Sequence, residues 1–429
     1  MDDVTFPKMS ESMCLFIDRI RAKQKEVHQW LDSHEDTKEL PLYSSVDIRD
    51  SGLKIAVVDT NLFPAGFNNL CEHGLEDAVK FIREAIDKRV PDCRDILIVA
   101  EEHTRNTWYL ENIRILQQII DKAGYQTKIA TFISVQPSFC ENAKYVELET
   151  ATNQPVRIYC FKRILADYEA DRQNIDLIIM NNDLTSGIPE ILKHSRIPIY
   201  PSVAAGWHAR HKSYHFAHTE ELMREFARII DLDPWLFSCL FSVADHVDIN
   251  IEGDRKKIMD LGSDLFARIK AKYQEHGIKE KPYIVIKPDA GTYGMGVVAV
   301  EDPSEILNLN RRSRNNLYKG KNAQIIDRIL LQEGVSTIYT VDQLVSEVVI
   351  YQIENNLIGG FYRTNAQKSS RENLNSAGMD FKKMCPHLKK YGDCGMHHDV
   401  NVFDVYRILA RIAGIAAHRE IIQLEANNK

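Results

Sequence analysis

A lysine followed by a glycine-rich loop is the first combination of residues that could do chemistry. Residues 284–300, IVIKPDAGTYGMGVVAV, place Lys287 near the end of an apolar run, and Gly291, Gly294 and Gly296 precede a second apolar run. A P-loop has its lysine after the glycines at a helix start, and a dinucleotide-binding fingerprint is followed by a helix, so neither pattern applies. The segment is either a loop that covers phosphates with its backbone N–H groups, aided by the lysine, or a hairpin whose glycines serve only the turn.

Polar residues downstream favour the phosphate-binding alternative. The segment LLQEGV ends an apolar run with Gln332 and Glu333, where backbone amides and a carboxylate suit adenine and ribose. Arg363 follows in GGFYRTN, and Asn373 and Asn375 follow in RENLNSAG. Oxygen-bearing side chains at i and i+2 point the same way on an extended segment, which suits a Mg²⁺ ion shared with phosphates. A nearby basic residue would neutralise the charge that builds on a transferred phosphoryl group.

The elements that must position these residues change character along the chain. Strand-like runs at residues 53–60, 95–102, 126–134 and 175–184 alternate with helical patterns at 76–88 and 109–124. This spacing predicts βαβ units and a mainly parallel sheet in the first half. An amphipathic helix is predicted before it, at residues 10–34, and a mostly helical stretch after it, at 203–272.

The second half is predicted to be rich in β-strands. Residues 346–363 read as an antiparallel hairpin that turns at Glu354, Asn355 and Asn356, because asparagine tolerates the positive φ of tight turns. The chain closes with a long amphipathic helix at residues 400–427. The change between the two regimes lies within residues 231–281.

Polar residues also follow the predicted parallel strands, where α/β sheets bind ligands. These candidates are Asp59, Asn61, Glu102, Arg105, Asn106, Asn182 and Asp183. The segment GWHARHKSYHF adds Arg210 and Lys212. Guanidinium groups bind carboxylates bidentately, so an arginine here could bind a carboxylate substrate. The alternative is that these loops only cap helices and pair with each other.

The composition excludes several classes of protein. The 54 basic and 61 acidic residues give a formal charge of −7, which offers no overall attraction for nucleic acid. No apolar run approaches the roughly 20 residues of a membrane span, and residues 1–10 lack the pattern of a signal peptide. We therefore expect a cytoplasmic protein whose eight cysteines are reduced. A homo-oligomer is compatible with the sequence.

The sequences of the motifs point to a family more specifically than the chemistry of their individual residues does. KPDAGTYGMGV, QEGV, GGFYR and ENLNSAGM, together with VDTNLFPAGFNNL, EEHTRNTWYLEN, NNDLTSGIPEIL and GWHARHKSYHF, resemble the proteobacterial ATP-grasp-like glutamate–cysteine ligase family. The similar segments extend from about residue 54 to residue 379. The resemblance implies an α/β fold, with an N-terminal pre-ATP-grasp-like parallel-sheet domain at residues 1–235 and an ATP-grasp α+β domain at 236–429.

The resemblance also implies an activity. ATP would phosphorylate the γ-carboxylate of L-glutamate, and the amine of L-cysteine would attack the acyl phosphate, in the first step of glutathione synthesis. ATP and Mg²⁺ are the implied cofactors. Another ATP-grasp carboxylate–amine ligase and a non-catalytic ATP-binding protein remain the alternatives.

The site residues follow from combining the motifs with this resemblance. Catalysis is assigned to Lys287 and Arg363, and ATP binding to Lys287, Gly291, Thr292, Tyr293, Gly294, Gly296, Gln332 and Glu333. Substrate binding is assigned to Asp59, Asn61, Glu102, Arg105, Asn106, Asn182, Asp183, Arg210 and Lys212. The metal is assigned to Glu347, Asn373 and Asn375.

Two further sets of residues could bind metal. Glu425 and Asn427 have the E-x-N order of many ATP-grasp enzymes, but they continue a predicted helix, in which i and i+2 diverge by about 200°. The segment CPHLKKYGDCGMHH contains Cys385, His387, Cys394 and His397, yet their spacing matches no standard zinc finger. We expect a surface loop there rather than a metal site.

Overall fold

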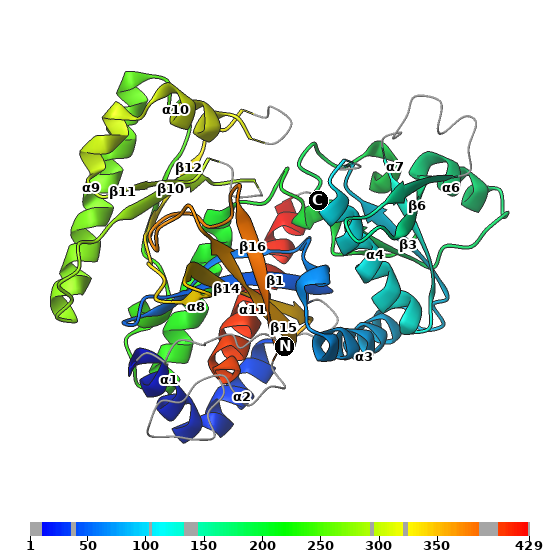
Figure 1. Ribbon diagram of the computed structural model, residues 1–429, viewed down its shortest axis with the longest axis horizontal. Coiled ribbons are helices and arrows are strands. Elements are labelled where there is room, and N and C mark those ends of the chain that lie inside the picture. The colour runs from blue at the N-terminus through cyan, green and yellow to red at the C-terminus, as the bar shows by residue number, and fades with distance from the viewer. Residues whose placement is uncertain are drawn as a thin grey trace.

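The protein has a mixed α/β fold, and the described part of the chain forms three sheets. The structure, a computed structural model, describes residues 11–35, 40–102, 105–132, 145–291, 296–320, 325–385 and 402–427. In Figure 1 an antiparallel sheet lies at the centre, a mainly parallel sheet lies to the right and a four-stranded antiparallel sheet lies to the left.

The central sheet combines strands from both ends of the chain. Its strands follow the order β16 (Met379–Met384), β15 (Asn356–Asn365), β14 (Leu344–Ile353), β1 (Tyr43–Asp50) and β2 (Ile55–Asn61), and β13 (Thr340–Val341) pairs with β14. All of these pairings are antiparallel. Successive side chains alternate between faces, so Val46 and Ile48 join one apolar core while Asp47 and Arg49 point to the opposite face.

Four helices cover the face that carries Val46 and Ile48. They are α1 (Glu11–Ala22), α2 (Gln24–His34), α8 (Lys212–Ile229) and α11 (Phe403–Asn427). Helix α11 contacts β1, β2, β14 and β15 and is enclosed by α1, α2 and α8. The helix is therefore covered on most sides, and side chains such as Phe403, Leu409 and Ala416 are buried.

The parallel sheet packs against the opposite face through two helices. Its order is β5 (Tyr145–Glu149), β6 (Pro155–Cys160), β4 (Gln126–Thr131), β3 (Asp95–Ala100), β7 (Leu177–Asn181) and β8 (Ile199–Tyr200), and only the β5–β6 pairing is antiparallel. Helices α3 (Glu72–Arg89) and α4 (Thr107–Lys122) share one core with Tyr43 and Tyr351 of the central sheet. Helix α6 (Phe161–Glu169) follows β6, and helix α7 (Glu190–Lys193) precedes β8.

The four-stranded sheet has one apolar and one polar face. Its order is β11 (Val298–Val300), β10 (Ile284–Pro288), β12 (Ile329–Glu333) and β9 (Phe241–Ala244). Helix α9 (Glu252–Glu275) covers Ile284 and Ile286, while Val285 and Lys287 face away from it. The remaining helices are α10 (Arg311–Tyr318), η1 (Phe67–Asn69), η2 (Val203–Ala205), η3 (Pro234–Phe237) and η4 (Pro303–Asn308).

The parallel sheet is confirmed, with one correction. The strand predicted at residues 53–60 is β2, but it pairs antiparallel with β1 in the central sheet. The chain reverses at residues 51–54, where Gly52 has a φ of 84°. A run of buried apolar residues reads alike in either kind of sheet, so the sequence pattern did not reveal the direction of its neighbour.

Three other predictions are refined. The helix predicted at residues 10–34 divides at Lys23 into α1 and α2, and residue 10 lies outside the described residues. The predicted hairpin is formed by β14 and β15, although the positive φ falls on Glu354 rather than on an asparagine. The terminal helix is confirmed but is not amphipathic, because it lies inside the molecule.

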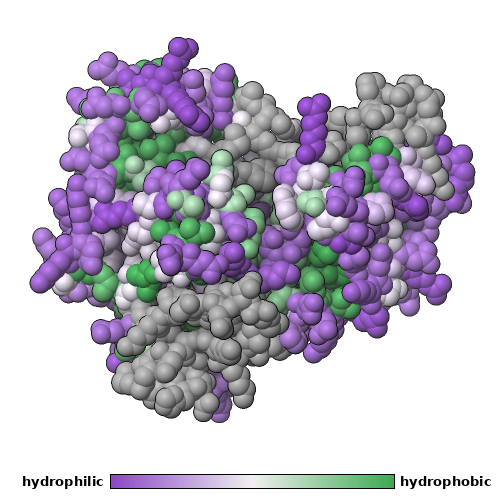
Figure 2. All heavy atoms as spheres, viewed as in Figure 1, coloured by the Kyte–Doolittle hydropathy of each residue, from purple (hydrophilic) through white to green (hydrophobic). Residues whose placement is uncertain are grey.

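The surface is largely hydrophilic on the face shown in Figure 2, and one cysteine differs from expectation. In Figure 2 hydrophilic side chains cover much of the face shown, especially over α9 and the outer part of the parallel sheet. None of the helices in the described ranges combines the length and apolar composition that a membrane span requires. The expectation that every cysteine is reduced is wrong for Cys160, which is disulfide-bonded; a sequence does not give the distances that decide pairing.

Candidate active site

A cleft lies between the central sheet and the polar face of the four-stranded sheet. Its empty volume, open mouth included, is about 810 Å³. The polar residues that line it are Asp47 and Arg49 on β1, Asp59 on β2, Lys212 on α8, Lys287 on β10, Gln332 and Glu333 on β12, Glu347 on β14, and Arg371, Glu372, Asn373 and Asn375 after β15. Several segments predicted separately from sequence are thus brought to one place.

Two lysines and an aspartate form a compact group at the cleft. Lys212 Nζ donates to the two Asp59 carboxylate oxygens at 2.6 and 2.8 Å. Burial opposes ionisation of Asp59, but Lys212 and Lys287 outweigh it and hold the pKa of that carboxyl well below its usual range. Burial lowers the pKa of Lys287 to about 8, because Asp59 offsets only part of the desolvation. Lys287 is therefore a cation that loses its proton readily.

Lys287 has few partners within the protein. Its Nζ donates to the main-chain oxygen of Val58 at 3.0 Å and lies 5.1 Å from the centre of the Phe216 ring. An ammonium group has three N–H donors, and in the described part of the chain this carbonyl is the acceptor found for them. The side chain can therefore donate to a ligand in the cleft.

A buried aspartate fixes the relative position of the two lysines. Asp289 follows β10, and its carboxylate accepts from Ser213 N at 2.8 Å and from Ser213 Oγ at 2.6 Å. The main-chain oxygen of Asp289 accepts from Lys212 N at 2.7 Å. Arg328 Nε donates to the same carboxylate at 2.7 Å. The first turn of α8 is thus tied to the end of β10.

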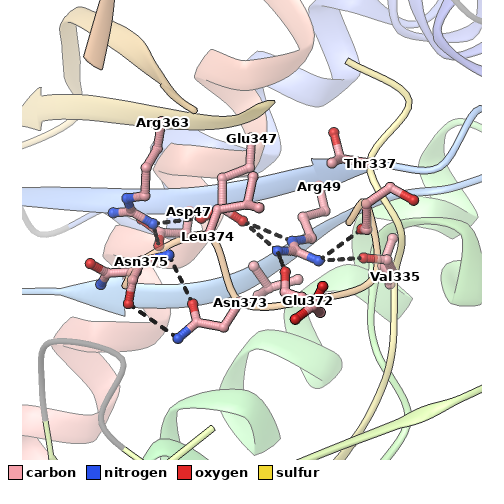
Figure 3. A network of polar contacts seen from close by, with 12 residues as sticks. Asp47, Arg49, Val335, Thr337, Glu347, Arg363, Glu372, Asn373, Leu374 and Asn375 are labelled. Atoms are coloured by element: carbon pink, nitrogen blue, oxygen red, sulfur yellow. Dashed lines mark hydrogen bonds and ion pairs between the residues drawn. The ribbon is translucent and has the colours of Figure 1, made fainter. Parts of the chain in front are cut away.

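Two arginines hold the carboxylates on the other side of the cleft (Figure 3). Arg49 Nε and Nη2 lie 2.8 and 2.7 Å from Glu347 Oε2, and Arg363 Nη1 donates to Glu347 Oε1 at 2.7 Å. Arg363 Nη1 also donates to Asp47 Oδ2 at 2.7 Å. Burial opposes ionisation of Glu347, but the two arginines outweigh it and lower the pKa of its carboxyl.

Asp47 is the carboxylate of this network whose ionised form is disfavoured. Burial raises the pKa of Asp47; Arg363 offsets only part of the rise, and the negative charges of Glu347 and Asp59 add to it. The three carboxylates therefore crowd one another. A divalent cation placed among them would relieve this repulsion.

The two predicted asparagines lie beside the same network (Figure 3). Asn373 Oδ1 accepts from Asn375 N at 3.0 Å, and Asn373 Nδ2 donates to Asn375 O at 3.2 Å. Arg49 Nη2 donates to Glu372 O at 2.7 Å, which anchors the segment to β1. Asp47, Glu347, Asn373 and Asn375 together present the hard oxygen atoms that Mg²⁺ prefers.

Gln332 and Glu333 differ although they are neighbours. The amide nitrogen of Gln332 is buried and has no hydrogen-bond partner within the described residues. The Glu333 carboxylate, in contrast, accepts from Trp235 Nε1 at 3.1 Å and lies 3.0 Å from Lys54 Nζ. It also accepts from Leu240 N at 3.0 Å. Glu333 is thus satisfied internally, whereas the Gln332 amide is open to a ligand.

The glycine loop is described at both of its ends. Gly291 has a φ of 122° and lines the cleft. Gly296 has a φ of 71°, and a Cβ there would lie 2.4 Å from the main-chain oxygen of Asn316. Both positions therefore require glycine. Thr292, Tyr293 and Gly294 lie outside the described residues.

Most of the predicted strand-end residues do not line the cleft. Asn106 caps α4 by accepting from Tyr109 N at 3.1 Å. Asn182 Nδ2 donates to Ala100 O at 3.2 Å, and Asp183 Oδ1 accepts from Thr185 Oγ1 at 2.7 Å. The residues that lie away from it are Asn61, Glu102, Arg105, Asn106, Asn182 and Asp183.

Arg210 has a structural partner instead of a place in the cleft. It is 1% exposed, and its Nε lies 3.0 Å from Glu420 Oε2 on α11. Its Nη1 donates to Thr60 O at 2.9 Å. Burial opposes ionisation of Glu420, but Arg210 and His215 outweigh it and lower the pKa of that carboxyl. Arg210 is therefore paired inside the protein and lies outside the lining of the cleft, and its assignment to a substrate carboxylate stays a prediction.

The two polar residues that β1 contributes to the cleft were missed by sequence reasoning. Asp47 and Arg49 alternate with the buried Val46 and Ile48 on β1. This alternation is the signal that could have identified β1 and its polar face. A cation and an anion two residues apart on a half-buried strand are candidates for a site.

Two comparisons with known proteins each gave a match that covers most of the chain. The GshA family model, described as glutamate-cysteine ligase, matches residues 18–421. A solved structure from Methylobacillus flagellatus KT, provisionally named gamma-glutamylcysteine synthetase, is 32% identical, covers 98% of this chain and 100% of its own, and gives a TM-score of 0.85. A D-alanyl-alanine synthetase A from Vibrio cholerae is 11% identical, covers 75% of this chain and 81% of its own, and its TM-score of 0.34 supports no argument. The search of curated proteins gave no match.

Proposed function

The chain belongs to the glutamate–cysteine ligase family, and from this premise we propose that it joins L-glutamate to L-cysteine in the cleft, with ATP as the phosphoryl donor. The antiparallel pairing of β10 with β12, the lysine on β10 and the glycines that follow it in the sequence support an ATP-grasp arrangement. The observation that carries the proposal is Lys287, a buried cation at a cleft with a single main-chain acceptor within the described residues.

ATP binding is assigned to two edges of the cleft. Lys287 binds phosphate oxygens, and Gly291 lets the backbone approach them. The Gln332 amide, which is buried without a partner in the described part of the chain, donates to an acceptor nitrogen of the adenine ring. Because a buried amide without a partner is costly, bound ATP restores the hydrogen bond that the free protein lacks.

The amino-acid substrates require groups of both charges. Among the residues predicted for them, Asp59 and Lys212 line the cleft, and the pair offers one carboxylate and one ammonium group. Arg371 also lines the cleft. We assign the α-ammonium group of glutamate to Asp59 and the substrate carboxylates to Lys212 and Arg371, since zwitterions bind best where both charges are matched.

The ligation then proceeds in two balanced steps. A γ-carboxylate oxygen of glutamate attacks the γ-phosphorus of ATP, and ADP leaves with the electron pair of the broken P–O bond. The free amine of cysteine attacks the acyl carbon, phosphate leaves with the electron pair of the broken C–O bond, and the nitrogen transfers its surplus proton to the departing phosphate. Lys287 and Lys212 stabilise the negative charge on the phosphoryl group during its transfer and on the phosphate that leaves. Arg363 acts on this chemistry through Asp47 and Glu347, whose positions it fixes.

The carboxylate network fits Mg²⁺. Asp47, Glu347, Asn373 and Asn375 would hold the ion, because a carboxylate has about four lone-pair positions and the arginines occupy only some of those on Glu347. The raised pKa of Asp47 marks a place where positive charge is lacking. When bound, Mg²⁺ would supply positive charge to the phosphates of ATP.

Product analysis tests the proposal directly. The purified protein is incubated with ATP, Mg²⁺, glutamate and cysteine, and the products are identified by mass spectrometry against synthetic γ- and α-glutamylcysteine. We expect the γ-isomer and ADP in equal amounts, and ADP release should stop when either amino acid is omitted. ADP release with other acids and amines but not with this pair would instead indicate a different carboxylate–amine ligase.

A further inference from the structure

Three metal-binding side chains meet away from the cleft. Cys71 and His73 lie at the start of α3, and Cys385 directly follows β16. Their two sulfur atoms and one ring nitrogen all lie within 4.8 Å of one another, and Cys385 Sγ is 3.6 Å from His73 Nδ1. More than 300 residues of sequence separate the two segments, so only the fold brings these ligands together.

One separation between the ligand atoms matches an edge of a tetrahedral zinc site. Zn–S bonds are about 2.3 Å and Zn–N bonds about 2.0–2.1 Å, so an S···N edge of a tetrahedron is about 3.6 Å long. The observed distance from Cys385 Sγ to His73 Nδ1 equals this edge. The third atom, Cys71 Sγ, lies close enough for a small side-chain rotation to complete one face of the tetrahedron.

The surroundings hold two ligands firmly and leave access for an ion. Cys71 Sγ accepts from Gly74 N at 3.3 Å, which places the sulfur at the N-terminus of α3. A Cβ at Gly74 would lie 2.3 Å from the main-chain oxygen of Ile358, so this turn packs closely on β15. Cys385 is buried, while His73 is exposed and gives the ion a path from solvent.

The cluster differs from the other group of possible ligands in the described residues. Asp233, Glu275 and His276 also lie close together, but Lys272 Nζ donates to Asp233 at 2.8 Å and lies 2.9 Å from Glu275. A lysine already supplies the cation there. Two thiols with an imidazole are softer ligands and favour Zn²⁺ over Mg²⁺ or Ca²⁺.

We propose that Cys71, His73 and Cys385 bind one Zn²⁺ ion, with a water molecule as the fourth ligand. The ion joins the first turn of α3 to the end of β16, so it links the helix layer of the parallel sheet to the central sheet. None of the three residues lines the cleft, and the site is independent of the ligase chemistry. Binding releases the protons of both thiols, since the metal ligands are thiolates.

The test uses Co²⁺ as a spectroscopic substitute for Zn²⁺. The full-length protein is treated with a chelator under a non-thiol reductant and then titrated with Co²⁺. We expect one equivalent to bind with a thiolate-to-cobalt charge-transfer band and tetrahedral ligand-field bands, and one equivalent of Zn²⁺ to displace it. Absence of these bands, or no displacement by Zn²⁺, would overturn the proposal.

Variants identify the ligands. Cys71→Ser, Cys385→Ser and His73→Ala should each weaken binding at least tenfold, whereas Cys93→Ser and Cys14→Ser should bind as the parent does. Cys71→Ser keeps an N-cap oxygen, and His73 is exposed, so neither substitution should prevent folding. Zn²⁺ should raise the Tm of the parent but not that of His73→Ala. If Cys394→Ser abolishes binding while Cys71→Ser does not, the ligands lie in the segment CPHLKKYGDCGMHH and the proposal is wrong.

Discussion

Lys287 and Arg210 are two buried cations to which the sequence assigned similar roles, yet their surroundings differ. Arg210 is enclosed, and its guanidinium is matched by the Glu420 carboxylate and a main-chain oxygen. Lys287 borders a cleft, and within the described residues it donates to one main-chain oxygen. Asp59 is the carboxylate that most favours the charged form of Lys287, but its oxygens already accept hydrogen bonds from Lys212.

This difference is the one expected between a charge that serves the structure and a charge that serves the proposed function. A buried ion pair with matched hydrogen bonds is complete, and a ligand could reach it only by breaking it. A buried cation with spare donors at a cavity is costly in the free protein and favourable once an anion binds. The pKa of Lys287, lowered to about 8, records this cost.

Breaking the structural pair should give the largest effect on folding. Arg210→Met leaves the buried Glu420 carboxylate with His215 but without its arginine, so the free energy of unfolding should fall by about 3–5 kcal/mol. The folded fraction should keep kcat/KM for ATP within a few-fold of the parent. Chemical denaturation measures the first quantity and initial rates of ADP release measure the second.

A double variant serves as the control for that measurement. Arg210→Met combined with Glu420→Leu removes both charges and should recover much of the lost stability. A large fall in kcat/KM in the double variant, with stability recovered, would mean that Arg210 contacts a substrate after all.

The functional cation should behave in the opposite way. Lys287→Met should lower kcat/KM for ATP about 10²- to 10³-fold, because a charge aimed at the phosphates is lost. The same change should leave the free energy of unfolding equal or higher, since a poorly paired buried charge is removed. The matched control is Lys281→Met, an exposed lysine before the same strand that pairs with Glu301. Equal losses in both variants would rule out a specific role for Lys287.

The sequence could predict that Lys287 lies at a cleft because the evidence for it is local. The lysine, the glycines and the two flanking strands lie within 17 consecutive residues, and their order alone excluded a P-loop. Gly291 and Gly296 require glycine for reasons of backbone conformation, which sequence patterns record well. Glu347, Asn373 and Asn375, which also line the cleft, were predicted in the same way, from short segments of distinctive sequence.

The sequence could not reveal the partner of Arg210 because that evidence is tertiary. Arg210 and Glu420 are 210 residues apart, and only the fold shows that α11 carries the carboxylate past α8. The assignment of β2 to the wrong sheet has the same cause, because its neighbour is decided by long-range pairing. The division into residues 1–235 and 236–429 stays a prediction, and the central sheet contains strands from both parts.

The pH dependence of turnover should follow Lys287. Its pKa of about 8 means that the ammonium group is present below pH 8 and is lost above it, so kcat/KM for ATP should fall about tenfold per pH unit well above 8. Unfolding does not explain such a fall: the pKa is lowered from 10.5, the unfolded chain binds more protons between pH 8 and 10.5, and this group's contribution to stability rises with pH. Lys287→Arg should move the fall to higher pH, and an unchanged profile would assign it to another group.

The smallest effect should come from the two buried glutamines, which repeat the comparison without charge. Gln332 has an amide nitrogen with no partner in the described residues, whereas Gln352 Nε2 donates to Ser44 Oγ and to Ala410 O. Gln332→Leu should raise the KM for ATP about tenfold with little loss of stability, because the hydrogen bond exists only in the complex. Gln352→Leu should lower the free energy of unfolding by about 1–3 kcal/mol and leave the KM unchanged. If the two variants exchanged these effects, an unpaired buried donor would not mark the ligand site, and the assignment of adenine to Gln332 would fail with it.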